Sequence, residues 1–159
     1  METNKPIIYQ EKVSGTKWGF YLSPIAILPL LVDYFNHSLS SKTYLTAGLF
    51  LFIFISIGAL MKLEWFFNST TFSYKMRPFH FKWQQIPLNE IQKIEVLKIN
   101  PLLEFGGWGL RFGKLGKAYT IEGKLILHIE LKSGKKLNFT VKNKIATDIA
   151  IQNLRITSN

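Results

Sequence analysis

The distribution of apolar and polar positions divides the chain into three parts. Residues 43–61 read TYLTAGLFLFIFISIGALM and carry no charge between Lys42 and Lys62. As a helix rising ~1.5 Å per residue, this stretch would cover roughly 28 Å, close to the ~30 Å hydrocarbon core of a bilayer. The pattern therefore predicts a membrane span at 43–61.

A second apolar stretch, WGFYLSPIAILPLLVDYF at 18–35, comes before it. Aromatic residues lie at both of its ends, as is favoured at the headgroup level of a bilayer. Pro24 and Pro29 would kink such a helix. Together the two stretches predict a transmembrane helical hairpin over 18–62. A cleaved signal peptide is the less favoured alternative, because the leader is long and two prolines interrupt the apolar run.

Charge around the two predicted spans indicates their orientation. Lysines lie on the leader side of the first span, and basic residues follow the second, which predicts two cytoplasmic termini. Residues 1–17 are then a polar cytoplasmic leader, and the protein is a multi-pass inner (plasma) membrane protein. Asp33, just inside the far end of the first span, is interpreted as a boundary residue. A proton-relay or ion-site role is the alternative.

From residue 63 the pattern changes to period two, which predicts a cytoplasmic β-rich domain over 63–159. Residues 63–67 and 71–76 read as two strands joined by a turn. A clearer hairpin follows Gly123, with Ser133-Gly134 as its turn. Its inward side chains are expected to be Leu125, Leu127, Ile129, Leu131, Leu137, Phe139 and Val141.

The chain ends in a predicted helix. Asn143 offers an N-cap, and helical spacing places one group of apolar side chains on a common side. They are Ile145, Ala146, Ile149, Ala150 and Leu154. The order of elements predicts an α+β or mainly-β sandwich closed by a C-terminal helix.

Composition argues against several kinds of chemistry. The chain has no cysteine, which excludes disulfides and cysteine-containing zinc sites. His37, His80 and His128 show no metal-ligand spacing and are interpreted as structural or surface residues. The glutamates are scattered, with no Ser/His/Asp arrangement. We therefore expect no catalytic residue, no cofactor and no metal, and we predict that the protein is not an enzyme.

Several short motifs carry a family resemblance. They are Ile86-Pro87-x-x-Glu90-Ile91, Asn100-Pro101, Gly106-Gly107-Trp108-Gly109-x-Arg111, Ala118-Tyr119, Gly123, Gly134-Lys135-Lys136 and Thr140. The region from 63 to about 155 resembles the bacterial pleckstrin-homology (PH)-like domains. The whole chain is similar to small bacterial membrane proteins with a two-helix hairpin ahead of such a domain.

The resemblance implies a seven-stranded, bent antiparallel sheet capped by the last helix, and no particular activity. It assigns a structural role to Gly106, Gly107, Trp108, Gly109, Arg111, Tyr119 and Gly123. The chain departs from the family where members often carry Ile-Gly-Thr-Gln, because only Thr140 matches there. The loop at 68–71 has no basic residue, so inositol phosphate recognition by the route of eukaryotic relatives is unsupported.

The glycine-rich stretch at 106–116 also has a phosphate-binding interpretation, since glycine frees backbone N–H groups to bind anions. It has neither the P-loop spacing nor a position at the start of a helix in a βαβ unit. A bend in the sheet, with Trp108 as its packing anchor, is the favoured interpretation.

Positive charge is concentrated behind the predicted spans. The whole chain has a formal net charge of +10. Residues from Lys62 onward include 16 basic and 7 acidic residues, so this part carries +9 of that charge. Arg111, Lys114, Lys117 and Lys124 form a cluster that could contact anionic lipid, at about 1 kcal/mol each near such a surface. A solvated basic face is the equal alternative. No motif interleaves aromatic and basic residues as RNA-binding domains do, so no nucleic acid is expected.

These observations predict a membrane-anchored, non-catalytic binding or assembly module that mediates protein–protein association at the inner membrane. Its expected partners are the lipid bilayer and either a second copy or another membrane protein. An anionic-lipid-sensing module that uses the basic face is the first alternative. An unrecognised enzyme or transporter component is the second.

Overall fold

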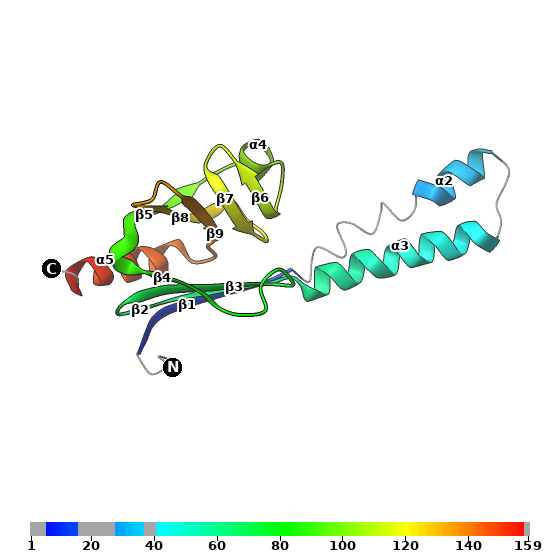
Figure 1. Cartoon of the computed structure of the whole chain (residues 1–159). Coiled ribbons are helices and arrows are strands. Elements are labelled where there is room, and N and C mark those ends of the chain that lie inside the picture. Colours follow the sequence, from blue (N-terminus) through cyan, green and yellow to red (C-terminus); the bar gives the residue numbers. More distant parts are fainter. Residues whose placement is uncertain (1–5, 16–27, 37–40, 158–159) are drawn as a thin grey trace. The chain divides into compact units, whose positions relative to one another are not determined.

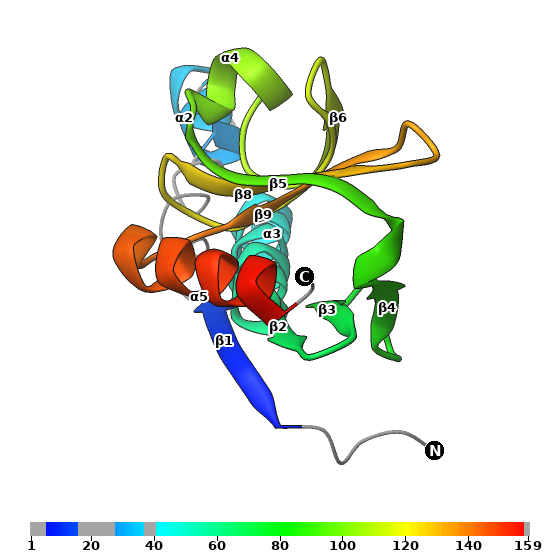
Figure 2. The same cartoon turned by 90° about the vertical axis from the view of Figure 1, so that its left-hand side faces the viewer.

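A computed structural model describes residues 6–15, 28–36 and 41–157 (Figures 1 and 2). The chain divides into two compact units. Unit 1 combines Met1–Val13 with Lys62–Asn159, and unit 2 is Ser14–Met61.

Four strands of unit 1 form the first sheet. It contains β1 (Ile7–Ser14), β2 (Lys62–Asn68), β3 (Thr71–Arg77) and β4 (Gln84–Pro87), in the spatial order β1-β2-β3-β4. β3 pairs with both β2 and β4 in antiparallel register, with Trp65 opposite Tyr74 and Phe72 opposite Ile86. Residues of the predicted leader thus contribute a strand to this sheet.

The second sheet begins after a short 3-10 turn, η2 (Leu88–Glu90). It contains β5 (Ile91–Lys98), β6 (Gly109–Gly113), β7 (Gly116–Thr120), β8 (Leu125–Leu131) and β9 (Lys136–Thr140), in the order β5-β8-β9-β7-β6. β7 and β9 run parallel, whereas the other pairs are antiparallel. Helix α4 (Pro101–Phe105) connects β5 to β6, and helix α5 (Lys144–Thr157) ends the unit.

An aromatic core lies between the two sheets. The ring of Phe139 in β9 is 4.9 Å from that of Phe72 and 4.8 Å from that of Tyr74, both in β3. The indole Nε1 of Trp65 in β2 donates to the carbonyl of Thr140, 3.0 Å away. Because these side chains are almost fully buried, the hydrophobic effect holds the sheets face to face.

The second sheet is buried on its other face as well. Phe105 of α4 and Ala118 of β7 pack there against Ile126 of β8. Side chains on both faces of β8 are therefore buried, including Leu127 on one face and His128 on the other. A strand covered on both faces does not show the simple alternation of a half-exposed strand.

The two predicted hairpins are confirmed. β2 and β3 pair around a turn in which Asn68 Oδ1 accepts the backbone N–H groups of Thr70 (2.9 Å) and Thr71 (2.6 Å). β8 and β9 pair around Ser133-Gly134, where Gly134 has a φ of 81°. Turn chemistry and alternation are local signals, which is why sequence predicted both.

Helix α5 is confirmed. Of the apolar side chains predicted on one side, Ala150 and Leu154 are buried, but two others are not. Asn143 Oδ1 accepts the N–H of Ala146 at 3.1 Å, as expected of an N-cap. Ile145 and Ile149 are exposed, at 73% and 52%. The side chains that face the body are those of Thr147, Ala150, Ile151 and Leu154. The polar Thr147 is tolerated inside because its hydroxyl bonds the carbonyl of Asn143, 2.8 Å away.

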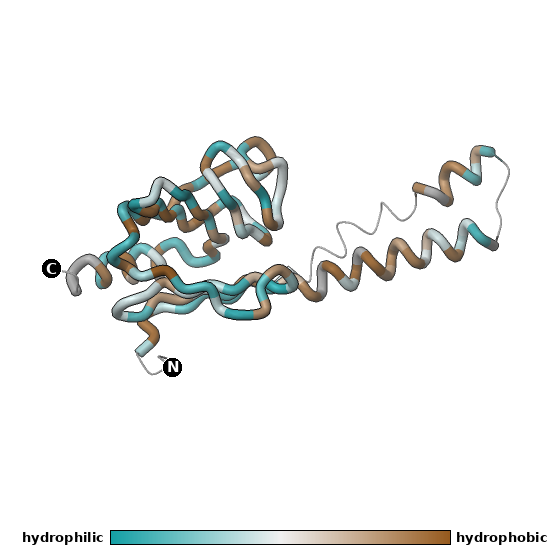
Figure 3. The backbone as a smooth tube through the Cα atoms, in the orientation of Figure 1, coloured by the Kyte–Doolittle hydropathy of each residue, from teal (hydrophilic) through white to brown (hydrophobic). Residues whose placement is uncertain are grey.

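Unit 2 contains α2 (Leu28–Phe35) and α3 (Ser41–Leu60). The hydroxyl of Thr43 in α3 donates to the carboxylate of Asp33 in α2. Asp33 therefore links the two helices. Figure 3 shows α3 as largely apolar, and large side chains such as Leu45 and Phe52 are exposed. The N–H of Gly15 donates to the carbonyl of Met61 at 2.7 Å, which joins the two ends of the unit.

The predicted membrane topology is corrected. Within residues 28–36 and 41–157, no helix meets the combined length and hydropathy needed to cross a membrane. The spans predicted at 18–35 and 43–61, the transmembrane hairpin over 18–62 and the multi-pass inner-membrane location are therefore not supported. Residues 16–27, which include much of the first predicted span, lie outside the described part of the chain.

The predicted fold class is corrected too. The structure is α+β, with a β-rich body and a C-terminal helix, but the described strands form two sheets, one of which includes a parallel pair. A single bent antiparallel sheet of PH-like type behind a membrane hairpin is not supported. Sequence could not show the parallel β7–β9 contact, since it joins strands separated by the whole of β8.

Candidate functional site

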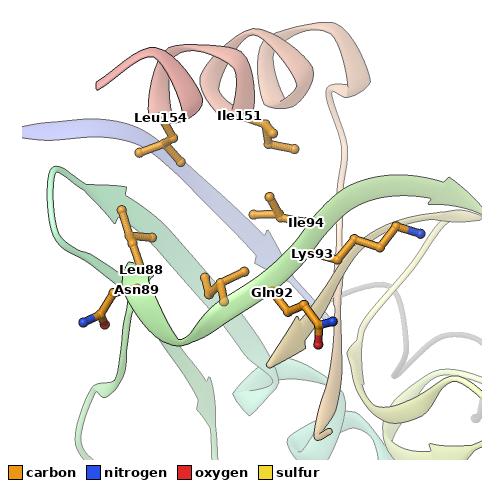
Figure 4. A pocket seen from close by; sticks show the side chains of 8 residues that line it. Leu88, Asn89, Gln92, Lys93, Ile94, Ile151 and Leu154 are labelled. Atoms are coloured by element: carbon orange, nitrogen blue, oxygen red, sulfur yellow. The ribbon is translucent and has the colours of Figure 1, made fainter. Parts of the chain in front are cut away.

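A pocket of about 420 Å³ lies in unit 1 between α5 and the segment formed by η2 and β5 (Figure 4). It is called the α5 pocket here. Its lining residues are Leu88, Asn89, Ile91, Gln92, Lys93, Ile94, Ile151 and Leu154. In Figure 4, Ile151 and Leu154 project from the helix toward the side chains of Leu88 and Ile94. The pocket is thus lined by apolar side chains of α5 and of the η2–β5 segment, with the polar side chains of Asn89, Gln92 and Lys93 beside them.

The η2 turn is fixed at both ends, which holds its part of the pocket in place. The N–H of Leu88 donates to the carbonyl of Thr70 in the β2–β3 turn, at 2.9 Å. The carbonyl of Glu90 accepts the N–H of Lys132, also at 2.9 Å. Pro87, immediately before the turn, has no N–H and a φ of −58° that suits the start of a 3-10 turn. The chain thereby passes from the first sheet to the second beside α5.

The helix side of the pocket is positioned by β1 as well as by its own cap. The carboxylate of Glu11 accepts the N–H of Lys142 at 3.3 Å and the hydroxyl of Tyr9 at 2.6 Å. Tyr9 OH lies 3.4 Å from the hydroxyl of Thr147 in α5. Glu11 is 6% exposed. A buried carboxylate with these donors connects the first strand to the start of the last helix.

The α5 pocket contains no group suited to acid–base or nucleophilic catalysis. Lys93 is its one ionisable lining residue, and its Nζ lies 2.7 Å from Glu95 Oε1. The hydrogen bond to Glu95 raises the pKa of Lys93 above its ordinary value. A nucleophilic lysine needs a lowered pKa instead. What the lining offers a ligand is apolar side chains, two amides and one ammonium group.

A second group of side chains lies where β3, β7 and the β3–β4 connection meet. The hydroxyls of Tyr74 and Tyr119 are 3.4 Å apart, and the ring of His80 lies 5.5 Å from that of Tyr74 and 5.4 Å from that of Tyr119. Burial raises the pKa of both tyrosines. Burial, and then the charge of Lys117, lowers the pKa of His80. All three groups are thus held in their neutral forms, as packing residues.

A third polar group lies on the second sheet. His128 Nδ1 is 2.7 Å from Asn138 Oδ1, while Asn138 Nδ2 donates to the carbonyls of Leu115 (2.8 Å) and Lys117 (3.2 Å). Glu130 pairs with Lys136 at 2.8 Å and lies 3.3 Å from His128 Nε2. Hydrogen bonds from Lys136 and then His128 lower the pKa of Glu130. This network ties the β6–β7 hairpin to β8 and β9.

The glycine-rich motif is placed around α4 and the start of β6. Gly106, with a φ of 69°, forms the left-handed C-cap of α4. Trp108 Nε1 donates to the carbonyl of Gly123 at 2.9 Å, and Arg111 Nε donates to the carbonyl of Trp108 at 3.2 Å. The half-exposed Trp108 therefore bonds one loop to another. Gly107 and Gly109 also have positive φ values, and Tyr119 belongs to the aromatic core.

The predicted basic cluster is only partly brought together. Arg111 lies in β6, Lys114 in the β6–β7 turn and Lys117 in β7, so one hairpin carries all three. Lys124 lies after β7, in the connection to β8. Lipid contact by these residues stays a prediction.

Two features escaped the sequence analysis. The α5 pocket depends on the approach of residues 88–94 to residues 151–154, which no local pattern indicates. The Tyr74–His80–Tyr119 group likewise joins distant segments. Among the described residues, no group of three or more His, Asp or Glu side chains is placed to hold a metal ion.

Comparisons of the chain with family models, with curated proteins and with solved structures found no match. The function proposed for the protein therefore depends on the geometry of the α5 pocket and on the surface chemistry of unit 1.

Proposed function

We propose that the protein is a non-catalytic binding module that takes a short apolar segment of a partner protein into the α5 pocket. The observation that carries the proposal is the pocket itself, in which apolar side chains of β5 and α5 converge between amide side chains. Burying one large apolar side chain of a partner there would contribute about 1.5–3 kcal/mol.

The position of the pocket favours an extended peptide segment as the occupant. β5 stands at the end of the strand order of the second sheet. A segment laid beside it could insert one apolar side chain while the amides of Asn89 and Gln92 bond its backbone. Recognition by an apolar anchor with a polar surround is the usual arrangement of a protein interface. The net charge of +10 favours acidic residues beside that anchor.

The proposal is tested by panning a random peptide library against the full chain and measuring the affinity of enriched peptides for variants. Leu88→Asp places a charge in the pocket wall, and Gln92→Trp fills space beside it. Both should weaken binding by about tenfold or more, because the first puts a charge where an apolar side chain would be buried and the second occupies its space. Ile149→Asp is the matched control. It changes an exposed side chain of α5, the helix that lines the pocket, on the face away from the body, so binding should be unchanged.

Two further measurements complete the design. Thermal unfolding of each variant separates loss of binding from loss of folding, and unlabelled full chain added as competitor reveals whether a second copy occupies the pocket. The proposal is wrong if enriched peptides bind the pocket variants as well as they bind the wild type. It is also wrong if only small apolar molecules, and no peptide, occupy the site.

A further inference from the structure

Three phenylalanines of unit 1 are largely exposed to water. Phe79 and Phe81, in the β3–β4 connection, are 50% and 87% exposed, and Phe112 in β6 is 75% exposed. None of them belongs to the aromatic core. A ring that is 87% exposed contacts almost no other part of the described chain. Large apolar side chains exposed together on a surface mark sites that bind a membrane or another molecule.

The two segments that carry these rings are joined through His80, Tyr119 and Lys117. The ring of His80, which stands between Phe79 and Phe81, lies 5.4 Å from that of Tyr119 in β7. Lys117 Nζ is 5.1 Å from the ring centre of Tyr119 and 5.5 Å from that of Phe112. These contacts bring the β3–β4 connection and the β6–β7 hairpin to one region of the surface.

The same two segments are strongly basic. Residues 77–83 (RPFHFKW) and 109–120 (GLRFGKLGKAYT) contain five lysines and arginines and no acidic residue. Arg77, Lys82, Lys114 and Arg111 are exposed. The aromatic-basic surface is defined here as Phe79, Phe81 and Phe112 with Arg77, Lys82 and Lys114.

We infer that the aromatic-basic surface binds the interface of an anionic lipid layer. Exposed rings enter the boundary between headgroups and acyl chains, where apolar side chains of peripheral proteins are buried. The flanking cations are attracted to the negative surface of the layer. Each contribution alone is weak, and their combination on one surface gives reversible binding. This function is separate from peptide binding in the α5 pocket.

A lipid layer fits this surface better than nucleic acid does. Proteins that bind single strands align a basic groove with aromatic rings on which bases stack. Here the most exposed of the three rings, that of Phe81, is 87% exposed, and none of the three lines the α5 pocket. Phe112 alternates with Arg111 along β6, so ring and charge point to opposite sides of the strand. The cation placed beside the Phe112 ring is Lys117, whose Nζ lies 5.5 Å from the ring centre.

A local probe tests the inference. Because the chain has no cysteine, Phe81→Cys gives a single site for a polarity-sensitive fluorophore in the full-length protein. The label should shift to shorter wavelength with vesicles of phosphatidylcholine and phosphatidylglycerol, and not with phosphatidylcholine alone. Ser133→Cys, in the exposed β8–β9 turn, is the matched label that should not respond. A local label also distinguishes this surface from any contact that the exposed apolar side chains of α3 make.

Charge is tested in the Phe81→Cys background. Lys82→Gln and Lys114→Gln should each weaken vesicle binding by about fivefold, and salt should weaken it further. Lys144→Gln, which removes an exposed lysine at the start of α5, should have little effect. A label that responds equally to both kinds of vesicle, or to neither, would overturn the inference. So would a response to single-stranded DNA that equals the response to anionic vesicles.

Discussion

At the scale of single residues, the structure assigns different roles to side chains that look alike in the sequence. His80 and His128 are both structural, but His80 packs between two tyrosines, whereas His128 bonds an amide and a carboxylate. Trp65 is fully buried with its N–H paired, while Trp108 is half-exposed and joins two loops. Sequence predicted that the histidines are not metal ligands, but it could not distinguish these surroundings.

His80 should make stability depend on pH. Burial and Lys117 hold its pKa below the ordinary value of 6.5. At higher pH the ring is neutral in both states, so its packing contributes fully to stability. As the pH falls below 6.5, the unfolded chain takes up the proton first, and the free energy of unfolding decreases.

Urea unfolding of the wild type and of His80→Gln, at about pH 7.5 and about pH 5, measures this effect. The wild type should lose more stability between the two conditions than the variant does. Comparing the two proteins cancels the contributions that the substitution leaves unchanged. Equal losses would show that His80 is not held neutral by its surroundings.

At the scale of elements, predictability follows the distance in sequence between contacting parts. The β2–β3 and β8–β9 hairpins and the cap of α5 depend on neighbouring residues, and sequence predicted all three. The α5 pocket, the parallel β7–β9 pair and the buried face of α5 depend on distant contacts. Apolar Ile145 and Ile149 suggested the wrong face because the true face includes Thr147, a polar residue that satisfies its own hydroxyl within the helix.

The close approach of β7 to β9 gives a prediction at Gly116. Its φ is +93°, and a Cβ there would lie 2.5 Å from the carbonyl oxygen of Lys136. Gly123 has a similar φ of +80° but open space around it. Alanine at either position incurs a backbone strain of roughly 1–3 kcal/mol. Only Gly116→Ala also forces two strands apart.

Gly116→Ala should therefore destabilise unit 1 by about 1–3 kcal/mol more than Gly123→Ala does, as expected of overpacking. Thermal or urea unfolding of the two variants measures the difference. If the free energy of unfolding falls by the same amount in both variants, the backbone at Gly116 does not approach Lys136 closely enough to exclude a Cβ.

At the scale of the whole molecule, unit 1 is closed by contacts between the two ends of the chain. The segment expected to be a leader provides β1, whose Tyr9 packs on Trp65 at 5.6 Å and whose Glu11 bonds the backbone before α5. Sequence did not reveal this because the polar residues of 1–17 show no sustained alternation. The membrane hairpin was predicted from apolar length, aromatic residues at the span ends and flanking charge, and the structure does not support it.

Substitution of Glu11 tests whether these contacts between β1 and the segment before α5 stabilise unit 1. Glu11→Ala leaves Lys142 N–H and Tyr9 O–H without their acceptor in a buried site, which should cost about 1.5–3 kcal/mol. Glu64→Ala is the control. Its carboxylate lies 3.8 Å from Lys12 Nζ in a partly exposed pair, which contributes at most about 1 kcal/mol. Chemical unfolding of both variants measures the costs, and similar values would show that β1 is not essential to the closure.

The hydrogen bond between Gly15 and Met61 has a consequence for how this chain can be altered. Unit 2 is inserted in the sequence between β1 and β2, which are neighbours in the first sheet. Its two ends are joined by the hydrogen bond between Gly15 and Met61. A tight loop could thus replace it without stretching the remaining backbone, in the manner of a domain inserted at a hairpin tip. We therefore expect the β-rich body to fold when a tight loop takes the place of unit 2.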